Sequence, residues 1–171
     1  YIGFALPYFS GWDTGWYVAT SLYLAKHLSE IASILVYPGK AVTFTFPWGE
    51  VITYPLHFEE PLPYLLFAVL VKLGLSASLI PLVVVPLFSA LSLAPFYLLV
   101  RHLYGERTAL IAAGLLAFAP MQFRLMLDLY RNTIANFFFL SSVYFALTEK
   151  GRIPHKTIVF STLLFASHIY V

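Results

Sequence analysis

An isolated carboxylate near the start of the chain is the first group that could do chemistry. Asp13 lies between two tryptophans in the stretch WDTGW and is followed by residues that predict a helix. A carboxylate at a membrane–water boundary can act as a general base or as a ligand of a divalent metal. The same position also suits an N-cap that accepts backbone N–H bonds from the helix. Both interpretations stay open, because a cap also aims the carboxylate along the helix axis.

A second group of charged residues lies in the stretch FRLMLDLYRN. Arg124, Asp128 and Arg131 are spaced i, i+4 and i+7, so they share one face if this segment is helical. Two guanidiniums beside a membrane suit a lipid-linked phosphate, which arginine binds bidentately. An acid held between them stays ionised and can coordinate a metal or position a substrate. The alternative interpretation is a ladder of surface salt bridges.

The third candidate stretch is YPLHFEEPLPY, which contains His57, Glu59 and Glu60. The two glutamates directly precede Pro61, so they could instead favour the N-terminus of a helix through its dipole. His57 could be structural or interfacial. The chain has no cysteine and no HExxH, Walker or GxGxxG pattern. Zinc hydrolysis and nucleotide binding therefore have no support in the sequence.

Composition places these groups in a membrane protein. The 171 residues are 60% hydrophobic and 11% charged, whereas about 25% of residues are charged in a soluble domain. Mean hydropathy is +0.82. The net charge is only +2, without a concentrated basic patch, so we expect no nucleic-acid partner. Both ends are apolar and the first residue is not Met, so we expect a fragment of a longer protein.

Apolar runs and basic connections predict the topology. Residues 1–12 are expected to end a first span, and further apolar runs are long enough to form transmembrane helices. These predicted spans are residues 78–100, 108–123, 132–148 and 157–171. Arginines and lysines gather in the connections near residues 101–107 and 150–156, which the positive-inside rule places in the cytoplasm. Residues 13–77 then form a long external loop.

That external loop is expected to hold its own secondary structure. Asp13, Thr20 and His27 recur at heptad spacing and predict an amphipathic helix with a polar face, lying at the membrane surface. The run Pro61–Leu75 is too short for a span and predicts a second surface helix. Residues Val42–Tyr54 surround a Pro-Trp-Gly turn and predict a small hairpin. The predicted fold class is all-α, a polytopic transmembrane helix bundle with a long external first loop.

The order of several short motifs resembles the GT-C membrane glycosyltransferases, which include oligosaccharyltransferase catalytic subunits and protein O-mannosyltransferases. The motifs cover nearly the whole chain and are DTGWYVAT, YPLHFEEPLPYLLFAVLVKLG, RHLYGER, LLAFAP and RLMLDLYRN. The sequence departs from the mannosyltransferase pattern, because Thr14 follows Asp13 where an acidic pair is common. All residues, 1–171, would belong to one transmembrane glycosyltransferase domain.

The resemblance implies roles for particular residues. Asp13 and Asp128 would be the catalytic acids, which activate the acceptor or bind a divalent cation, Mg²⁺ or Mn²⁺. Arg124 and Arg131 would contact the phosphate of the donor. Tyr17, His57 and Glu60 are also assigned to substrate binding.

The expected function is transfer of a sugar or oligosaccharide from a polyprenyl (dolichyl or undecaprenyl) phosphate donor to a protein or lipid acceptor. The active site would face the extracytoplasmic side of the cell membrane, and membrane lipid would be a further partner. The alternative is a non-enzymatic polytopic protein, either a transporter or flippase or a scaffold subunit. A transporter predicts ionisable groups inside the spans, and the spans 78–100 and 108–123 contain none.

Overall fold

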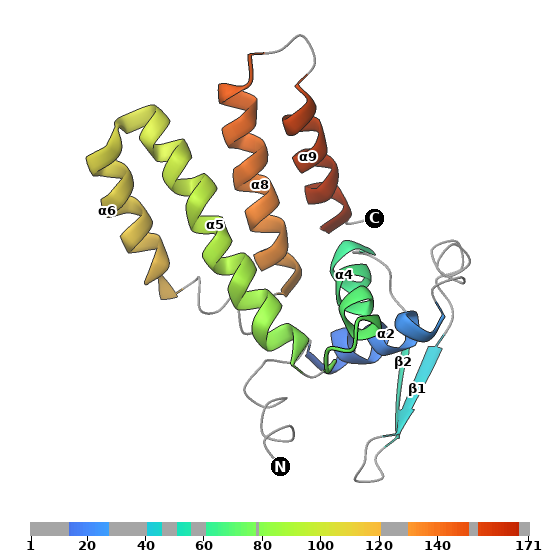
Figure 1. Ribbon diagram of the computed structural model, residues 1–171. Coiled ribbons are helices and arrows are strands. Elements are labelled where there is room, and N and C mark those ends of the chain that lie inside the picture. Colours follow the sequence, from blue (N-terminus) through green and yellow to red (C-terminus); the bar gives the residue numbers. More distant parts are fainter. Residues whose placement is uncertain are drawn as a thin grey trace. The chain divides into compact units, whose positions relative to one another are not determined.

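The computed structural model describes residues 14–27, 41–45, 51–55, 61–77, 79–120, 130–150 and 154–167. The described part is all-α in class, with six helices and one two-stranded hairpin (Figure 1). The chain divides into two compact units, the first formed by residues 1–82 and 170–171 and the second by residues 83–169. The elements are α2 (Thr14–Lys26), β1 (Ala41–Thr45), β2 (Val51–Pro55), α4 (Pro61–Lys72), α5 (Ile80–Tyr104), α6 (Glu106–Ala117), α8 (Tyr130–Thr148) and α9 (His155–Ser167).

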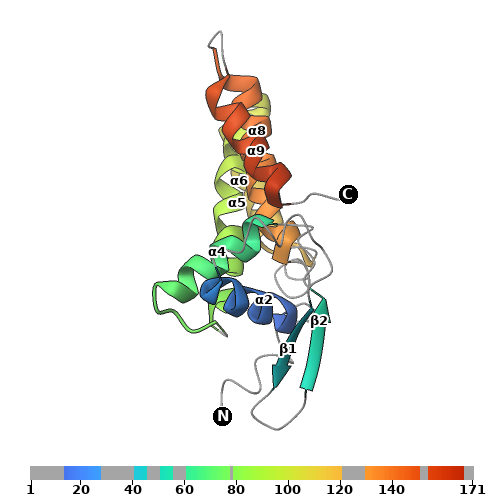
Figure 2. The same ribbon diagram turned by 90° about the vertical axis from the view of Figure 1, so that its right-hand side faces the viewer.

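The hairpin of the first unit confirms the sequence prediction. β1 and β2 pair antiparallel, with Ala41 opposite Pro55 and Thr45 opposite Val51. Both strands are rich in the β-branched and aromatic residues that favour a pleated surface. β1 also contacts α2 (Figure 2). An isolated two-stranded hairpin is only marginally stable in water, so this contact with a helix contributes to its stability.

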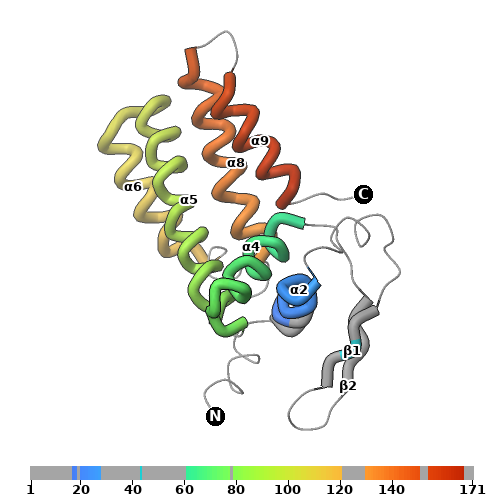
Figure 3. The backbone as a smooth tube through the Cα atoms, turned by 45° about the vertical axis from the view of Figure 1, so that its right-hand side comes forward, coloured from blue at the N-terminus to red at the C-terminus, as the bar shows by residue number. Residues whose placement is uncertain are grey.

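Helix α2 packs on α4 through a face that the sequence analysis assigned wrongly. Tyr17, Thr20, Ser21 and Leu24 are all buried, and their spacing of i, i+3, i+4 and i+7 defines one side of the helix. The heptad spacing of polar residues predicted that Thr20 lies on a polar, solvent-facing side. The small hydroxyl residues instead belong to the packed face, because short side chains allow close approach of a neighbouring helix. The two helices cross each other in the first unit (Figure 3).

Helix α4 presents Pro63, Tyr64, Phe67 and Ala68 as its buried residues. It ends at Lys72, three residues before the end of the predicted surface helix. The backbone N–H of Leu75 donates to the carbonyl of Leu70 (3.1 Å), and that of Gly74 donates to the carbonyl of Val71 (2.9 Å). Gly74 has φ 94°. This pattern is a Schellman motif, in which glycine takes the left-handed position that ends the helix.

Helix α5 is the longest element. Within the described ranges it is the one helix that is both long and apolar enough to cross a membrane, judged by length and composition. It runs for 25 residues through Pro86 and Pro95 without a break. Helix α6 has 12 residues and α9 has 13, and the last residues of the two predicted spans, 121–123 and 168–171, lie outside the described ranges. Helix α8 has 19 residues and begins two positions earlier than expected.

A layer of phenylalanines joins α5, α8 and α9 inside the second unit. The ring of Phe88 on α5 lies 5.6 Å from that of Phe137 and 5.9 Å from that of Phe138, measured between centroids. Both α8 rings lie 6.1 Å from the ring of Phe160 on α9. Edge-to-face and tilted pairs at such distances are favourable beyond the area that they bury. This layer fixes the relative height of the three helices.

The pair α8 and α9 has further contacts above that layer. Phe145 lies 5.2 Å from Phe160 between ring centroids, and the Nζ atom of Lys156 lies 5.3 Å from the centre of the Phe145 ring. The hydroxyl oxygens of Ser142 and Ser161 are 2.6 Å apart. Aromatic contacts, a cation–π contact and a hydroxyl pair therefore hold this helical hairpin.

Candidate functional site

Most of the residues that the sequence analysis assigned to the site lie outside the described residues. These are Asp13, Asp128, Arg124, His57 and Glu60. Their roles in catalysis, phosphate binding, substrate binding and metal binding stay predictions, as does the expectation that the two aspartates share one cavity.

The position of Asp13 in the sequence can be related to a described helix. Helix α2 begins at Thr14, so Asp13 directly precedes its first residue. The first N–H groups of a helix lack intrahelical partners, and the helix dipole places partial positive charge at that end. Asp13 itself lies outside the described residues, so its role as an N-cap stays a prediction.

Tyr17 is a described candidate residue, and it lies in the packed core of the first unit. Its side chain is only 2% exposed. Its ring stacks on that of Tyr64 with a centroid distance of 4.8 Å and an interplanar angle of 24°, and it lies 5.9 Å from the ring of Phe67. The rings of Tyr64 and Phe67 therefore cover part of the Tyr17 ring. A substrate contact at Tyr17 would have to compete with this core packing.

Arg131 is the other described candidate residue. It is the second residue of α8 and is half-buried, while Tyr130, Thr133 and Ile134 around it on the first turn are fully buried. Packing of these neighbours holds the start of α8 in place. A guanidinium here adds its charge to the partial positive charge of the helix N-terminus, and the two together favour an anion such as a phosphate.

No metal centre forms among the residues that the structure describes. They contain no group of three or more His, Asp or Glu side chains that could hold an ion. The predicted ligands, Asp13 and Asp128, are outside those ranges. The divalent-cation prediction is therefore untested.

Sequence reasoning missed the carboxylate of Glu149, which joins the end of α8 to the start of α9. Its Oε1 accepts the backbone N–H of Lys156 (3.0 Å), and its Oε2 accepts both the backbone N–H (3.1 Å) and the hydroxyl (3.0 Å) of Thr157. These bonds, the one from the Lys156 amide first, hold the pKa of Glu149 below its usual range. The sequence signal was an acid a few residues ahead of Pro154 and a new helix.

The comparisons with known proteins add no assignment. No family model, curated protein or solved structure matches the chain. The functional interpretation therefore rests on the residues themselves and on the geometry of the helices.

Proposed function

We propose that this chain is part of a polytopic membrane glycosyltransferase that uses a polyprenyl-phosphate-linked sugar as donor. The acceptor is a protein or lipid, and the reaction takes place on the extracytoplasmic side of the membrane. The order of sequence motifs from Asp13 to Asn132 motivates the reaction class. The observation that carries the membrane part of the proposal is the long apolar helix α5, which packs beside α8 through Phe88 and Phe137.

Measured from the contact between Phe88 and Phe137, α5 and α8 extend over similar distances in both directions. Phe88 and Phe137 are in contact, and α5 continues from there to Arg101 while α8 leads to Lys150, thirteen positions further on in each case. At 1.5 Å per residue these basic residues are about 20 Å beyond the phenylalanine layer. In the other direction Ile80 and Tyr130 lie about 10 to 12 Å from it. The total of about 30 Å equals the hydrocarbon thickness of a bilayer.

The exposed side chains of α5 and α6 are also suited to lipid. Large apolar residues point away from the protein along both helices. They are Val83, Leu87, Leu91 and Leu98 on α5 and Leu110, Ile111 and Leu115 on α6. In water such a surface would favour association or aggregation. In a bilayer it meets acyl chains that are equally apolar.

Three serine hydroxyls on α5, α8 and α9 donate hydrogen bonds to carbonyls of their own helix. Ser92 donates to the carbonyl of Phe88 (2.8 Å), Ser141 to that of Phe137 (2.7 Å) and Ser167 to that of Leu163 (2.7 Å). Each bond reaches back four residues along the same helix. Back-bonding of this kind satisfies a polar group without water, as a bilayer interior requires.

In the proposed reaction an oxygen or amide nitrogen of the acceptor attacks the anomeric carbon of the donor sugar. The bond between that carbon and the phosphate oxygen breaks, its electron pair stays on the phosphate, and polyprenyl phosphate leaves. Asp13 accepts the proton of the acceptor. Arg131, together with Arg124, stabilises negative charge that develops on the leaving phosphate. A divalent cation held by Asp13 and Asp128 would assist the leaving group as a Lewis acid.

The test uses the full-length protein in membranes with a polyprenyl-linked sugar and a mixture of acceptors. Asp13→Asn keeps the size of the side chain and removes its basicity, so sugar transfer should fall by about 10²- to 10⁴-fold. The control is Glu106→Gln, which changes an exposed carboxylate in the first turn of α6. Equal transfer by the Asp13→Asn variant and the wild type would reject the role of Asp13.

A further inference from the structure

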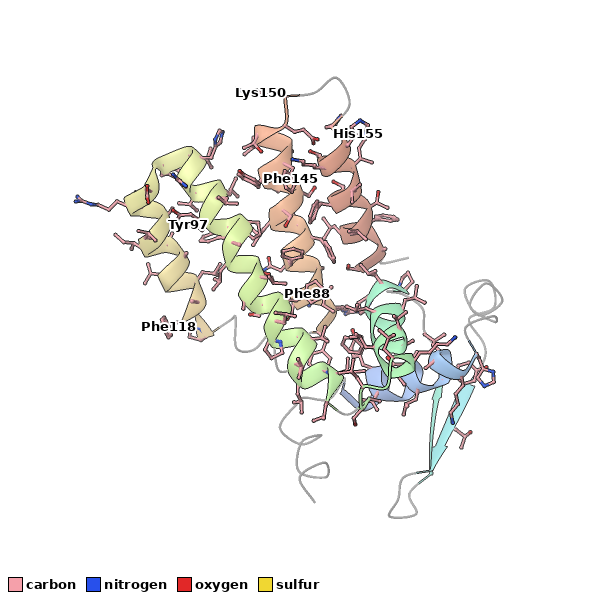
Figure 4. The ribbon with its side chains drawn as sticks, viewed as in Figure 1. Phe88, Tyr97, Phe118, Phe145, Lys150 and His155 are labelled. Atoms are coloured by element: carbon pink, nitrogen blue, oxygen red, sulfur yellow. The ribbon has the colours of Figure 1, made fainter. Side chains whose placement is uncertain are left out.

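Two connections of the second unit bring basic residues to one end of its helices. Arg101 lies in the last turn of α5 and Arg107 in the first turn of α6, while Lys150 follows the end of α8 and Lys156 lies in the first turn of α9. Figure 1 shows both connections at the same end of the unit, and Figure 4 shows Lys150 and His155 there, with Phe118 at the other end. The four basic residues are all exposed. We call this set of four the basic end.

The two acidic residues at the basic end, Glu106 and Glu149, already interact with other groups of the protein. Glu106 lies 3.8 Å from the guanidinium of Arg101. Glu149 accepts hydrogen bonds from the first turn of α9, where the helix dipole already compensates much of its charge. Among the described residues, Arg107 and Lys150 have no such ion-pair partner. The positive charge at this end is therefore left for a partner outside the described chain.

The residues next to these basic side chains are of the types that are common at a membrane–water boundary. Leu103 and Tyr104 lie between Arg101 and Arg107 in the sequence and are exposed, with Tyr104 at 71%. Tyrosine is enriched at the level of lipid headgroups, where its ring is apolar and its hydroxyl is wet. The aliphatic chain of Lys156 places its ammonium over Phe145, so this lysine covers apolar surface and keeps its charge at the end of the helices.

We propose that the basic end binds the headgroups of anionic phospholipids. Arg101 and Lys150 each lie thirteen positions, or about 20 Å, beyond the phenylalanine layer, where a bilayer changes from acyl chains to headgroups. Arg107 and Lys150 offer unpaired charge to the lipid phosphates, and Tyr104 inserts beside them. The inference rests on the membrane-spanning part of the proposed function and does not depend on sugar transfer.

The probe is a spin-labelled phosphatidylglycerol, compared with spin-labelled phosphatidylcholine, in vesicles of unlabelled phosphatidylcholine that contain the full-length protein. Electron paramagnetic resonance measures the fraction of each label that is immobilised by the protein, and the two fractions give a relative association constant. We expect a preference for phosphatidylglycerol in 0.1 M salt. In 1 M salt, where the Debye length is about 3 Å, this preference should disappear.

The decisive variant is Arg107→Gln/Lys150→Gln. Each basic residue near an anionic surface contributes about a fivefold preference, so this variant should lose at least about fivefold. The matched control is Lys26→Gln/Lys72→Gln, which removes the same charge from exposed lysines at the ends of α2 and α4. A wild type without preference for phosphatidylglycerol, or an equal loss in both double variants, would overturn the proposal.

Two further measurements separate the alternatives. Soluble glycerol phosphate at millimolar concentration should not displace the labelled lipid, and full competition by it would show a site for free phosphate instead. Flotation of the protein with pure phosphatidylcholine vesicles tests membrane insertion by itself. Loss of flotation would reject the membrane part of the proposed function, whereas flotation without lipid preference would reject only the headgroup site. Sugar transfer by Arg107→Gln/Lys150→Gln should equal that of the wild type.

Discussion

The hydroxyl oxygens of Ser142 on α8 and Ser161 on α9 lie 2.6 Å apart, although nineteen positions separate the two residues in the chain. Neighbouring hydroxyls, such as those of Ser141 and Thr148, bond to carbonyls of their own helix. The serine pair instead crosses between helices. In a bilayer, where apolar contacts with lipid and protein are similar, such hydrogen bonds help to select the partner of a helix.

A double-mutant cycle should measure this bond. Ser142→Ala and Ser161→Ala remove one partner each, and their coupling in the free energy of unfolding should be about 0.6 kcal/mol and at most about 1.7 kcal/mol. The measurement is reversible unfolding of the full-length protein in mixed micelles. Ser141→Ala combined with Ser161→Ala is the control and should show no coupling. Equal coupling in both cycles would show that the serine pair has no specific role.

The phenylalanine layer should account for a large part of the packing between α5, α8 and α9. Phe138→Ala removes contacts to both Phe88 and Phe160, and it should lower the free energy of unfolding by about 3 to 5 kcal/mol. Phe165→Ala on α9 is the control, because Phe165 is 68% exposed and should cost far less. A larger loss for Phe165 than for Phe138 would contradict this assignment of the core.

Glu149 should make the start of α9 sensitive to acid. Its pKa is lowered in the folded protein from the usual value of 4.5, chiefly by the amide of Lys156. The stabilising contribution is therefore present above pH 4.5 and is lost as the pH falls through the lower, folded-state pKa. Hydrogen exchange of the Lys156 and Thr157 amides, corrected for the intrinsic rate, should accelerate in that range.

The variant Glu149→Gln provides the comparison for this prediction. A glutamine retains one carbonyl acceptor but places an amide NH₂ where the second carboxylate oxygen accepted a bond. One of the two amides should therefore lose protection already at neutral pH, and the acid-dependent change should vanish. The same acid dependence in Glu149→Gln as in the wild type would assign the effect to another group.

Two glycines on neighbouring segments should respond to alanine with opposite signs. Gly105, between α5 and α6, has φ 87° and ψ 172°, a conformation that is essentially confined to glycine and costs an alanine about 1 to 3 kcal/mol. Gly114 lies inside α6, where alanine gains about 0.5 to 1 kcal/mol over glycine. An added Cβ meets no atom within 4 Å at either position, so sterics do not confuse the comparison. Unfolding of Gly105→Ala and Gly114→Ala checks it, and equal effects would contradict it.

The hydroxyl of Thr20 predicts a stabilising substitution. Thr20 is 1% exposed, and its Oγ1 has no hydrogen-bond partner in the described part of the chain. A buried hydroxyl without a partner costs about 1 to 3 kcal/mol. Thr20→Val should therefore raise the free energy of unfolding by roughly 1 kcal/mol. Thr20→Ser keeps the hydroxyl and loses a methyl group, so it should destabilise. A lower stability for Thr20→Val than for Thr20→Ser would show that the hydroxyl has a partner.

Several elements could be predicted from the sequence because their signals are local. The hairpin followed from β-branched residues on both sides of the turn predicted at residues 47–49. The apolar run at residues 78–100 predicted most of α5, which the structure places at Ile80–Tyr104. The face of α2 could not be predicted in this way. Threonine and serine can lie toward solvent or toward a closely packed helix. In α2 they lie on the packed face, because Tyr17 on the same face packs on Tyr64 and Phe67 of α4.

Residue types and their spacing were enough to predict a composition typical of membrane proteins, the all-α class and the basic connections. They also predicted the candidate residues Asp13 and Asp128, which stay predictions. These features depend on residue type and on spacing along one segment, so they can be predicted without knowing which segments pack together. Only the tertiary structure decided that Tyr17 packs on Tyr64, that Ser142 meets Ser161 and that Glu149 accepts hydrogen bonds from α9. Each of these contacts joins residues of two different segments, so it exists only once the helices have packed.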